Sequence, residues 1–372
     1  MTIPVTLLLL LLLLAAHTAR AEYAIVTGAS SGIGRALALA AAQEGYDVVL
    51  CARRESALLA LSDVIRTTHQ RATVIVPTDL STSAGIDTLL HTTASLDVST
   101  IFVNAGFAWS DGSLSDQPTA SIEEMVNLNI MSSSKLASLY GSVFKERGSG
   151  KIMITSSLTA LASLPGASLY AATRGFVRQL GAGLRAELAP HGVVVTTLLP
   201  GATDTEFAVR TNIQSALIFT FPGSRLLGLT LSSEVVADYA LEGLKSGAAE
   251  VIPGFMNRAY AMAAENLMPA WMSRRYATYT FCEPNPLFDP YQAPTVLVVM
   301  LLGVLLMLPC IPFVCLSFLP LPAAILVALL TLIIVNVWQN GPRNHKPPKV
   351  STLNDIRVLA SKRDVVAAWR NG

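Results

Sequence analysis

The chain has 372 residues, of which 52% are hydrophobic and only 14% are charged, against about 25% charged residues in an ordinary soluble protein. This composition excludes a disordered chain and argues against a protein that is soluble over its whole length. The net charge of +1 argues against nucleic-acid binding, and the four scattered cysteines and five unclustered histidines argue against a disulfide framework and a zinc site.

The N-terminal segment, residues 1–21, is hydrophobic but short. Residues 4–16 carry no charge, and these 13 residues are fewer than the roughly 20 that a helical membrane span needs. We predict an uncleaved membrane anchor or a helix that lies shallowly in the membrane. A cleaved signal peptide is the alternative, because residues 19–21 read Ala-Arg-Ala, although no lysine or arginine precedes the apolar stretch.

Residues 22–290 have the pattern of a globular α/β domain, in which short apolar runs alternate with segments rich in alanine and leucine. Strands are predicted at Tyr23–Thr27, Asp47–Cys51, Thr73–Pro77, Thr100–Val103, Lys151–Thr155 and Val193–Leu198, and helices at Arg35–Glu44 and Ser56–Thr68. This alternation predicts a parallel sheet covered by helices on both faces.

The loop after the first strand reads GASSGIG, from Gly28 to Gly34. Glycine lets the backbone turn tightly and approach a pyrophosphate, whose charge the N-terminus of the next helix stabilises. We therefore predict a nucleotide-binding loop with contacts from Gly28, Ser30, Ser31, Gly32, Ile33 and Gly34. The same residues match the Gly-x-Ser-x-Gly nucleophile elbow of hydrolases, but that elbow follows several strands, and here a hydrophobic segment precedes the first one.

Further motifs follow the later strands in a fixed order. They are Asn104-Ala105-Gly106, Asn129 in the next helix, Ser157 at a strand end, Tyr170 with Arg174 four residues later, and Pro200-Gly201. Together with the glycine loop, these motifs resemble the short-chain dehydrogenase/reductase family from Tyr23 to about Phe207. The resemblance implies a Rossmann-like, doubly wound parallel sheet and an oxidoreductase that transfers hydride between a nicotinamide cofactor and a carbonyl or alcohol.

The resemblance also implies the roles of the catalytic residues. Reduction of a ketone needs a proton donor at the carbonyl oxygen, and Tyr170 takes that role, with Ser157 hydrogen-bonded to the same oxygen. Asn129 occupies the position of the asparagine that holds a water in a proton relay. A cation four residues after a helical tyrosine lies on the same face of the helix and favours the phenolate.

Arg174 is the departure from the family pattern, which has a lysine at this position. Arginine keeps the positive charge but is bulkier, planar and never deprotonated, so a relay through an amine cannot operate in the same way. Two outcomes follow: a working enzyme with an altered rate, or an NADP-binding membrane protein, impaired in catalysis, that acts as a sensor or scaffold. The other motif positions are intact, which favours an active enzyme.

The end of the second strand indicates the cofactor. NAD-specific folds place a carboxylate there for the ribose 2′-hydroxyl, whereas this chain has Arg53 and Arg54, which can pair with a 2′-phosphate. We predict NADP(H). The resemblance adds cofactor contacts from Asp79, Leu80, Asn104, Ala105, Gly106, Tyr170, Arg174, Pro200, Gly201, Thr203 and Thr205.

A second hydrophobic region follows the domain, and we predict a transmembrane hairpin over residues 291–338. From Thr295 to Trp338 no residue is charged, which is enough for two spans of about 20 residues, with prolines near the middle. A helical hairpin buried in a soluble core is the alternative. The tail, residues 339–372, has seven lysines and arginines against two aspartates, so it is expected to stay cytosolic, either resting on anionic lipids or simply solvated.

The segments that are expected to lie near the substrate are rich in apolar and aromatic residues. Residues 216–221 are nearly all apolar, and aromatic residues mix with arginines over residues 255–281, as at a membrane interface or in ordinary packing of the domain. This layout is similar to that of 3-ketosphinganine reductases. We therefore expect a membrane-bound enzyme of the endoplasmic reticulum with its catalytic domain facing the cytosol, acting on a lipophilic ketone or alcohol in contact with membrane lipids. The resemblance also allows a homo-oligomer.

Overall fold

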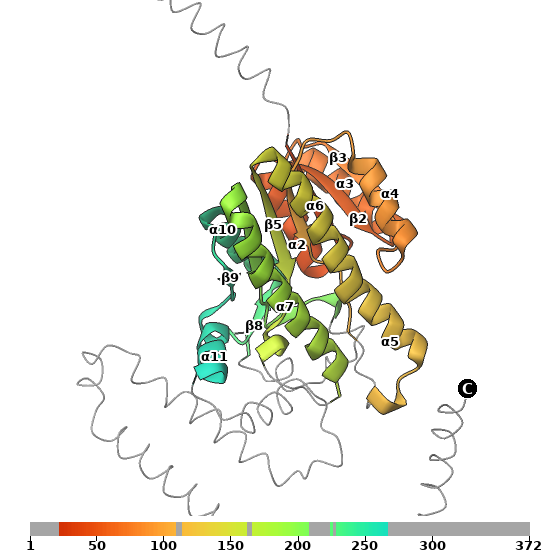
Figure 1. Ribbon diagram of the computed structural model, residues 1–372. Coiled ribbons are helices and arrows are strands. Elements are labelled where there is room, and N and C mark those ends of the chain that lie inside the picture. The colour runs from red at the N-terminus through yellow and green to blue at the C-terminus, as the bar shows by residue number, and fades with distance from the viewer. Residues whose placement is uncertain (1–21, 109–113, 162–165, 208–223, 226–227, 267–372) are drawn as a thin grey trace, which may run out of the picture. The chain divides into compact units, whose positions relative to one another are not determined.

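The computed structural model describes residues 22–108, 114–161, 166–207, 224–225 and 228–266. Its centre is a seven-stranded parallel sheet with the strand order β3-β2-β1-β4-β5-β6-β9 (Figure 1). The strands are β1 (Tyr23–Thr27), β2 (Asp47–Ala52), β3 (Thr73–Pro77), β4 (Val98–Val103), β5 (Gly150–Thr155), β6 (Val193–Leu198) and β9 (Glu250–Val251). Two short strands, β7 (Ala202–Asp204) and β8 (Thr230–Ser232), pair in parallel outside this sheet.

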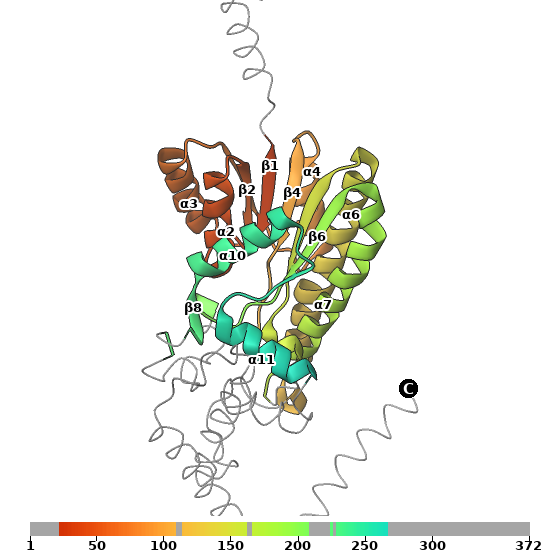
Figure 2. The same cartoon turned by 90° about the vertical axis from the view of Figure 1, so that its left-hand side faces the viewer.

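Helices cover both faces of the sheet, as Figure 2 shows. One face carries α2 (Gly32–Gln43), α3 (Glu55–Thr68) and α10 (Ser233–Ser246), whose apolar residues share a core cluster with Ala24 and Val26. The other face carries α4 (Ser83–Thr93), α6 (Ser133–Arg147) and α7 (Ser168–Leu188), which pack with Ile25 in a second cluster. Because successive side chains of a strand point to opposite faces, the apolar run of β1 supplies both cores.

Shorter elements complete the described part of the chain. They are α5 (Thr119–Val126), the π-helical stretch η2 (Asn127–Ser132), α11 (Phe255–Asn266), and the 3-10 turns η1 (Leu114–Asp116), η3 (Leu158–Leu161) and η4 (Ala189–His191).

The order of the strands reverses between β1 and β4. From β1 the chain winds outward through β2 to β3, and it then returns to the other side of β1 with β4. The strands pair in register, for example Ile25 with Val49 of β2 and with Ile101 of β4. In open parallel sheets, ligands bind at the carboxyl ends of the strands at such a reversal, so the fold itself places a site beyond Thr27 and Val103.

The fold predicted from the sequence, a Rossmann-like parallel sheet with flanking helices, is confirmed. The strands at Tyr23–Thr27, Thr73–Pro77 and Val193–Leu198 have the predicted bounds. Helix α2 begins at Gly32, three residues before the predicted start, because Ser31 is extended (φ −165°) and the glycine loop runs directly into the first helical turn. Strand β9 was not predicted, because it is only two residues long and pairs with residues more than fifty positions away.

In the described part of the chain, no helix is both long and apolar enough to cross a membrane. The predicted anchor at residues 1–21, the predicted hairpin at 291–338, the tail at 339–372 and the apolar run at 216–221 lie outside the described residues.

Candidate active site

The predicted site residues come together at the carboxyl ends of β1, β2, β4, β5 and β6, at the reversal of strand order. The glycine loop follows β1, Arg53 and Arg54 follow β2, residues 104–106 follow β4, and Ser157 follows β5. Residues 200–205 follow β6, and Tyr170 and Arg174 lie on α7. Site residues that are far apart in the sequence therefore lie together at one edge of the sheet.

The glycine loop needs its glycines for two different reasons. Gly28 (φ +70°) and Gly32 (φ +53°) have left-handed backbone conformations that side chains disfavour. Gly34 has no such conformation, but a Cβ there would lie 2.2 Å from the Gly28 carbonyl oxygen, so only glycine lets α2 pack this closely on the loop. The resulting backbone and the N-terminus of α2 form the cradle that a pyrophosphate requires.

Thr27, which was not predicted as a site residue, fixes the turn after β4. Its Oγ1 donates to the Phe102 carbonyl at 3.2 Å and accepts from the backbone N–H groups of Asn104 (2.8 Å) and Ala105 (3.0 Å). Asn104 returns a hydrogen bond from Nδ2 to the Thr27 carbonyl at 3.1 Å. The only feature of the sequence that indicates this role of Thr27 is a polar residue at the end of a buried strand.

Thr155, also missed in the sequence, connects that turn to the catalytic helix. Its Oγ1 donates to Asn104 Oδ1 at 3.2 Å, and its carbonyl accepts from Arg174 Nη1 at 3.1 Å. A continuous series of hydrogen bonds therefore runs from Thr27, which directly precedes the glycine loop, through Asn104 and Thr155 to Arg174.

Arg174 is buried beneath Tyr170. Its side chain is 4% exposed, and its Cζ lies 5.0 Å from the centroid of the Tyr170 ring. Nε is buried and has no hydrogen-bond partner in the described part of the chain. A Cβ on Gly106 would lie 2.2 Å from Nη2, so Gly106 provides the room for the guanidinium. This confirms that residues 170 and 174 share one face of α7.

Tyr170 is half-buried on α7, and Ser157 is buried just after β5. The ring of Tyr170 packs at a tilt against Phe207, with the ring centroids 5.9 Å apart. Ser157 is buried at the end of β5, where its Oγ accepts from the Thr159 backbone N–H at 3.2 Å and can still donate. A hydroxyl that can donate and a phenol beside a fixed cation suit the polarisation and protonation of a carbonyl oxygen.

Asn129 lies in η2 and is fully buried. Its side chain accepts from the Phe107 N–H at 3.1 Å and donates to the Phe107 carbonyl (2.9 Å) and Thr173 Oγ1 (3.1 Å). These contacts lock the segment after Gly106 to α7. Its predicted role in a proton relay stays a prediction, and the observed side chain acts as a structural connection.

The two arginines after β2 carry carboxylate partners. Arg53 Nη1 lies 3.2 Å from Glu124 of α5 and 3.8 Å from Asp79. Arg54 Nη2 donates to the carbonyl (3.1 Å) and Oγ (3.3 Å) of Ser30 in the glycine loop, and its Nη1 lies 3.1 Å from Glu206. Arg54 is therefore attached to the predicted cofactor loop, whereas Arg53 is more exposed.

The segment after β6 lies over the glycine loop. Thr205 is so close to Gly32 that a Cβ on that glycine would lie 3.0 Å from Thr205 Cγ2. Thr205 Oγ1 accepts from the Phe207 N–H at 3.2 Å, and Thr203 Oγ1 donates to the Gly201 carbonyl at 3.1 Å. A Cβ on Gly201 would lie 2.5 Å from Oδ1 of the buried Asn257 in α11. These contacts fix the predicted cofactor residues 201–205.

Cys51, at the end of β2, is not a nucleophile. Burial raises the pKa of its thiol to about 12, so the thiolate is absent at neutral pH. Within the described residues, no group of histidine, cysteine, aspartate and glutamate side chains is arranged to hold a metal ion.

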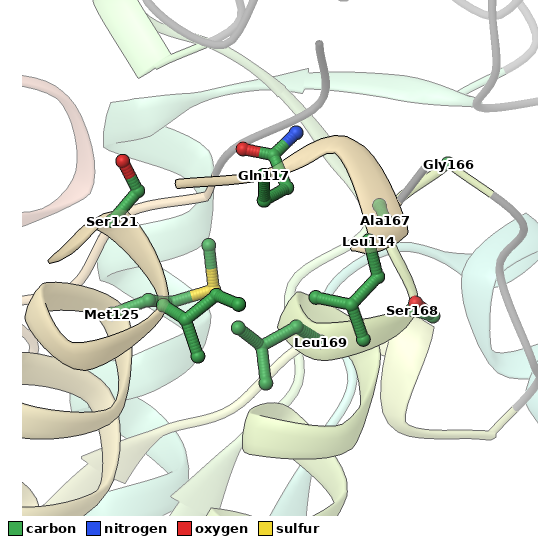
Figure 3. Close-up of a pocket in the computed structure, with 9 residues that line it drawn as sticks. Leu114, Gln117, Ser121, Met125, Gly166, Ala167, Ser168 and Leu169 are labelled. Atoms are coloured by element: carbon green, nitrogen blue, oxygen red, sulfur yellow. The ribbon is translucent and has the colours of Figure 1, made fainter. Parts of the chain in front are cut away.

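A pocket opens between α5 and the N-terminus of α7, directly before Tyr170 in the chain (Figure 3). Leu114, Met125 and Leu169 form its apolar part, and Gln117 and Ser121 stand at its edge. Such a surface suits an apolar group better than a charged one.

Comparison with known proteins relates this site to a large set of oxidoreductases. A family model described as short chain dehydrogenase matches residues 22–216. A 7beta-hydroxysteroid dehydrogenase of Clostridium sardiniense is 34% identical over 185 residues, which cover 50% of this chain and 70% of the relative.

Solved structures show the same similarity. A structure from a study of 7beta-hydroxysteroid dehydrogenase stereoselectivity has a TM-score of 0.63 at 26% identity and covers 69% of this chain and 96% of its own. A short-chain dehydrogenase from Sphingobium yanoikuyae in complex with NADPH has a TM-score of 0.59 at 31% identity and covers 66% of this chain and 92% of its own.

Proposed function

The chain belongs to the short-chain dehydrogenase/reductase family of oxidoreductases that act on hydroxyl and keto groups, and we propose that it is a membrane-bound, NADP-dependent member that acts on a lipophilic ketone or alcohol. The observation that carries this proposal is the position of Arg174. Its guanidinium carbon lies 5.0 Å from the centroid of the Tyr170 ring, and hydrogen bonds through Thr155 and Asn104 join it to Thr27, which directly precedes the glycine loop. A proton donor, a fixed cation and a cofactor cradle thus form one unit.

The residues of the cradle fit a nicotinamide dinucleotide. The glycine loop and the N-terminus of α2 suit a pyrophosphate, and Arg53 and Arg54 suit a 2′-phosphate. NADP is further supported by the NADPH complex of the Sphingobium relative.

The chemistry assigned to each residue follows from this arrangement. The bound cofactor supplies the hydride for the carbonyl carbon, or accepts it in the reverse direction. Ser157 donates a hydrogen bond to the carbonyl oxygen, and Tyr170 gives that oxygen its proton. The charge of Arg174 stabilises the phenolate that remains. Because a guanidinium keeps its protons, the proton that restores Tyr170 comes from solvent and does not pass through residue 174.

A lipophilic substrate is supported by two observations. The pocket beside the N-terminus of α7 is mainly apolar, and similar proteins include hydroxysteroid dehydrogenases. We propose an apolar carbonyl compound or alcohol as the substrate class, with a steroid, a retinoid and a long-chain keto lipid as the candidates.

Attachment to a membrane is proposed from composition. The uncharged stretch from Thr295 to Trp338 is long enough for a hairpin, and residues 1–21 add a second apolar segment. Basic residues in the tail favour the cytosolic side for the tail and, across a hairpin, for the catalytic domain, as expected for an enzyme of the endoplasmic reticulum.

The test is NADPH oxidation by detergent-solubilised protein with a panel of lipophilic ketones. We expect turnover by the wild type and a loss of at least about 100-fold in Tyr170→Phe, since general acid catalysis contributes that much. Tyr140→Phe is the matched control, because the Tyr140 hydroxyl is bonded to Thr93 in the core between α4 and α6. An inactive wild type that binds NADPH, together with an active Arg174→Lys variant, would instead identify a binding protein that lost catalysis at one position.

A further inference from the structure

Three consecutive residues after β7 contact three different parts of the site. Thr205 packs against Gly32 of the glycine loop, Glu206 pairs with Arg54, and Phe207 packs against the ring of Tyr170. This short segment therefore lies across the predicted cofactor site, from its phosphate end to its reactive end.

Glu206 forms an ion pair with Arg54, the arginine that is expected to bind the 2′-phosphate. Its Oε2 lies 3.1 Å from Arg54 Nη1, while Nη2 of the same guanidinium is bonded to Ser30. Arg54 is thus held at the cofactor loop with one of its two terminal nitrogens directed to a carboxylate. A phosphate on the cofactor ribose needs the same guanidinium.

We propose that Glu206 is a specificity residue for the cofactor, whose carboxylate competes with the 2′-phosphate of NADP(H) for Arg54 and so limits the preference for NADPH over NADH. The proposal rests on the NADP-dependent function above. NADH carries a hydroxyl in place of the phosphate, so its binding does not require Arg54 to leave Glu206.

The competition is physically reasonable because the ion pair is weak. Arg54 and Glu206 are 39% and 54% exposed, and pairs this exposed contribute little to stability. A phosphate can therefore displace the carboxylate. The displaced charge stays close by, however, and repels the phosphate, which weakens NADPH binding in either arrangement.

Glu206 is a better candidate than the carboxylates beside Arg53. Arg53 is 58% exposed and is shared between Asp79 and Glu124, and among the described residues it has no hydrogen bond or ion pair to the glycine loop. Glu206 also directly precedes Phe207, whose ring packs against that of Tyr170.

The experiment measures equilibrium binding of NADPH and NADH to the full-length, detergent-solubilised protein. We expect Glu206→Gln to bind NADPH about 3- to 10-fold more tightly and NADH no more tightly than the wild type, a change on the scale of one exposed charge. Glu187→Gln, an exposed glutamate of α7 away from the site, is the control with the same change in net charge. The probes 2′,5′-ADP and 5′-AMP, which lack the nicotinamide, should repeat the difference.

A double-mutant cycle gives the decisive comparison. In an Arg54→Gln background, Glu206→Gln should no longer change the ratio of NADPH to NADH affinity. The proposal is overturned if Glu206→Gln changes that ratio no more than Glu187→Gln does, or if its effect persists without Arg54. Failure of the wild type to bind NADPH at all would overturn the proposed function itself, and with it the role of Glu206.

Discussion

Arg174 combines a charge, nearly complete burial and few partners. Among the described residues its guanidinium has one hydrogen bond, to the Thr155 carbonyl, and its Nε has none. Burying a charge without a carboxylate costs stability, and such a cost is usually found where function requires the charge. The buried, incompletely paired cation therefore supports a catalytic role for residue 174.

Gly106 is the residue that makes arginine possible at position 174. In Gly106→Ala, the new Cβ would lie 2.2 Å from Arg174 Nη2 and 2.9 Å from Asn129 Oδ1. We expect a fall in kcat of at least about 10-fold and a loss of about 1–3 kcal/mol in the free energy of unfolding. Both should be measured together, by NADPH oxidation and urea unfolding.

The shorter side chain of Arg174→Lys should relieve this clash. The double variant Gly106→Ala with Arg174→Lys is expected to recover part of the activity. Gly183→Ala is the control, since nothing lies near its Cβ position and alanine favours an exposed helix site. If Gly106→Ala lowers the activity equally with lysine and with arginine at position 174, the glycine is needed for the space of the cofactor and not for that of Arg174.

Cys51 predicts how stability changes at alkaline pH. Burial raises the pKa of its thiol from 9.0 to about 12, so the folded state keeps the proton while the unfolded state releases it near pH 9. The stabilisation is complete below pH 9 and is lost as pH rises toward 12. We expect Cys51→Ala to lose less unfolding free energy than the wild type between pH 8.5 and 11, as measured by urea unfolding at each pH. Identical pH profiles would contradict this assignment. Burial also raises the pKa of Tyr140 to about 12, and Cys51 adds a smaller part of that rise, so Cys51→Ala removes this part as well and changes the profile in the same direction.

At the scale of elements, α11 is held beneath the site by one arginine of α7. Arg178 binds Glu250 of β9 through two hydrogen bonds of 2.7 and 2.9 Å, and its Nη1 lies 2.6 Å from Glu265 of α11. The bidentate bond to Glu250, together with Glu265, holds the pKa of Arg178 well above its ordinary value. Asn257 of α11 packs against Gly201, so the position of α11 bears on the cofactor segment.

Removing this connection should loosen α11. We expect Arg178→Gln to lower the free energy of unfolding by about 1–3 kcal/mol, a value reduced by partial exposure of the carboxylates, and to speed amide exchange in residues 255–266. Hydrogen exchange followed by mass spectrometry resolves that segment. Lys245→Gln, which breaks an exposed pair with Glu44, is the control and should change neither quantity measurably. Unchanged exchange in α11 would mean that packing alone holds it.

At the scale of the whole molecule, the described parallel sheet and its helices hold the candidate active site, and the proposal of membrane attachment rests on the composition of the residues outside them. The described domain is an ordinary α/β structure with cores on both faces of the sheet. The apolar excess of the chain lies mainly in residues 1–21 and 291–338, outside the described residues. The composition therefore distinguishes the segment that forms the α/β domain from two apolar segments of the kind found in membranes.

Membrane attachment predicts a simple fractionation result. We expect the full-length chain to stay in the membrane pellet after alkaline carbonate washing. Leu305→Lys with Leu330→Lys should lower the pellet fraction, because each lysine near the centre of a span costs about 2.5–3.5 kcal/mol. Isoleucine at the same two positions should leave the fraction unchanged. Release of the unmodified chain by carbonate would contradict the hairpin.

The sequence by itself determined the features that depend on local pattern. Buried parallel strands appear as continuous apolar runs, which is why the core strands were predicted to within a few residues. The glycine loop and the pair Tyr170 and Arg174 were predicted because their function requires a fixed spacing within one loop or one helix face.

Only the tertiary structure decided which distant residues meet. Three features depend on contacts between separate elements: the strand order, the hydrogen bonds of Thr27 and Thr155, and the space that Gly106 leaves for Arg174. No local sequence pattern predicts them. The same holds for Arg54, which appears in the sequence as a free cation for a phosphate. Its partner Glu206 lies about 150 residues away in the sequence, and only the folded structure shows that this carboxylate is paired with that arginine. Charge pairing depends on distance in space, and the fold sets that distance.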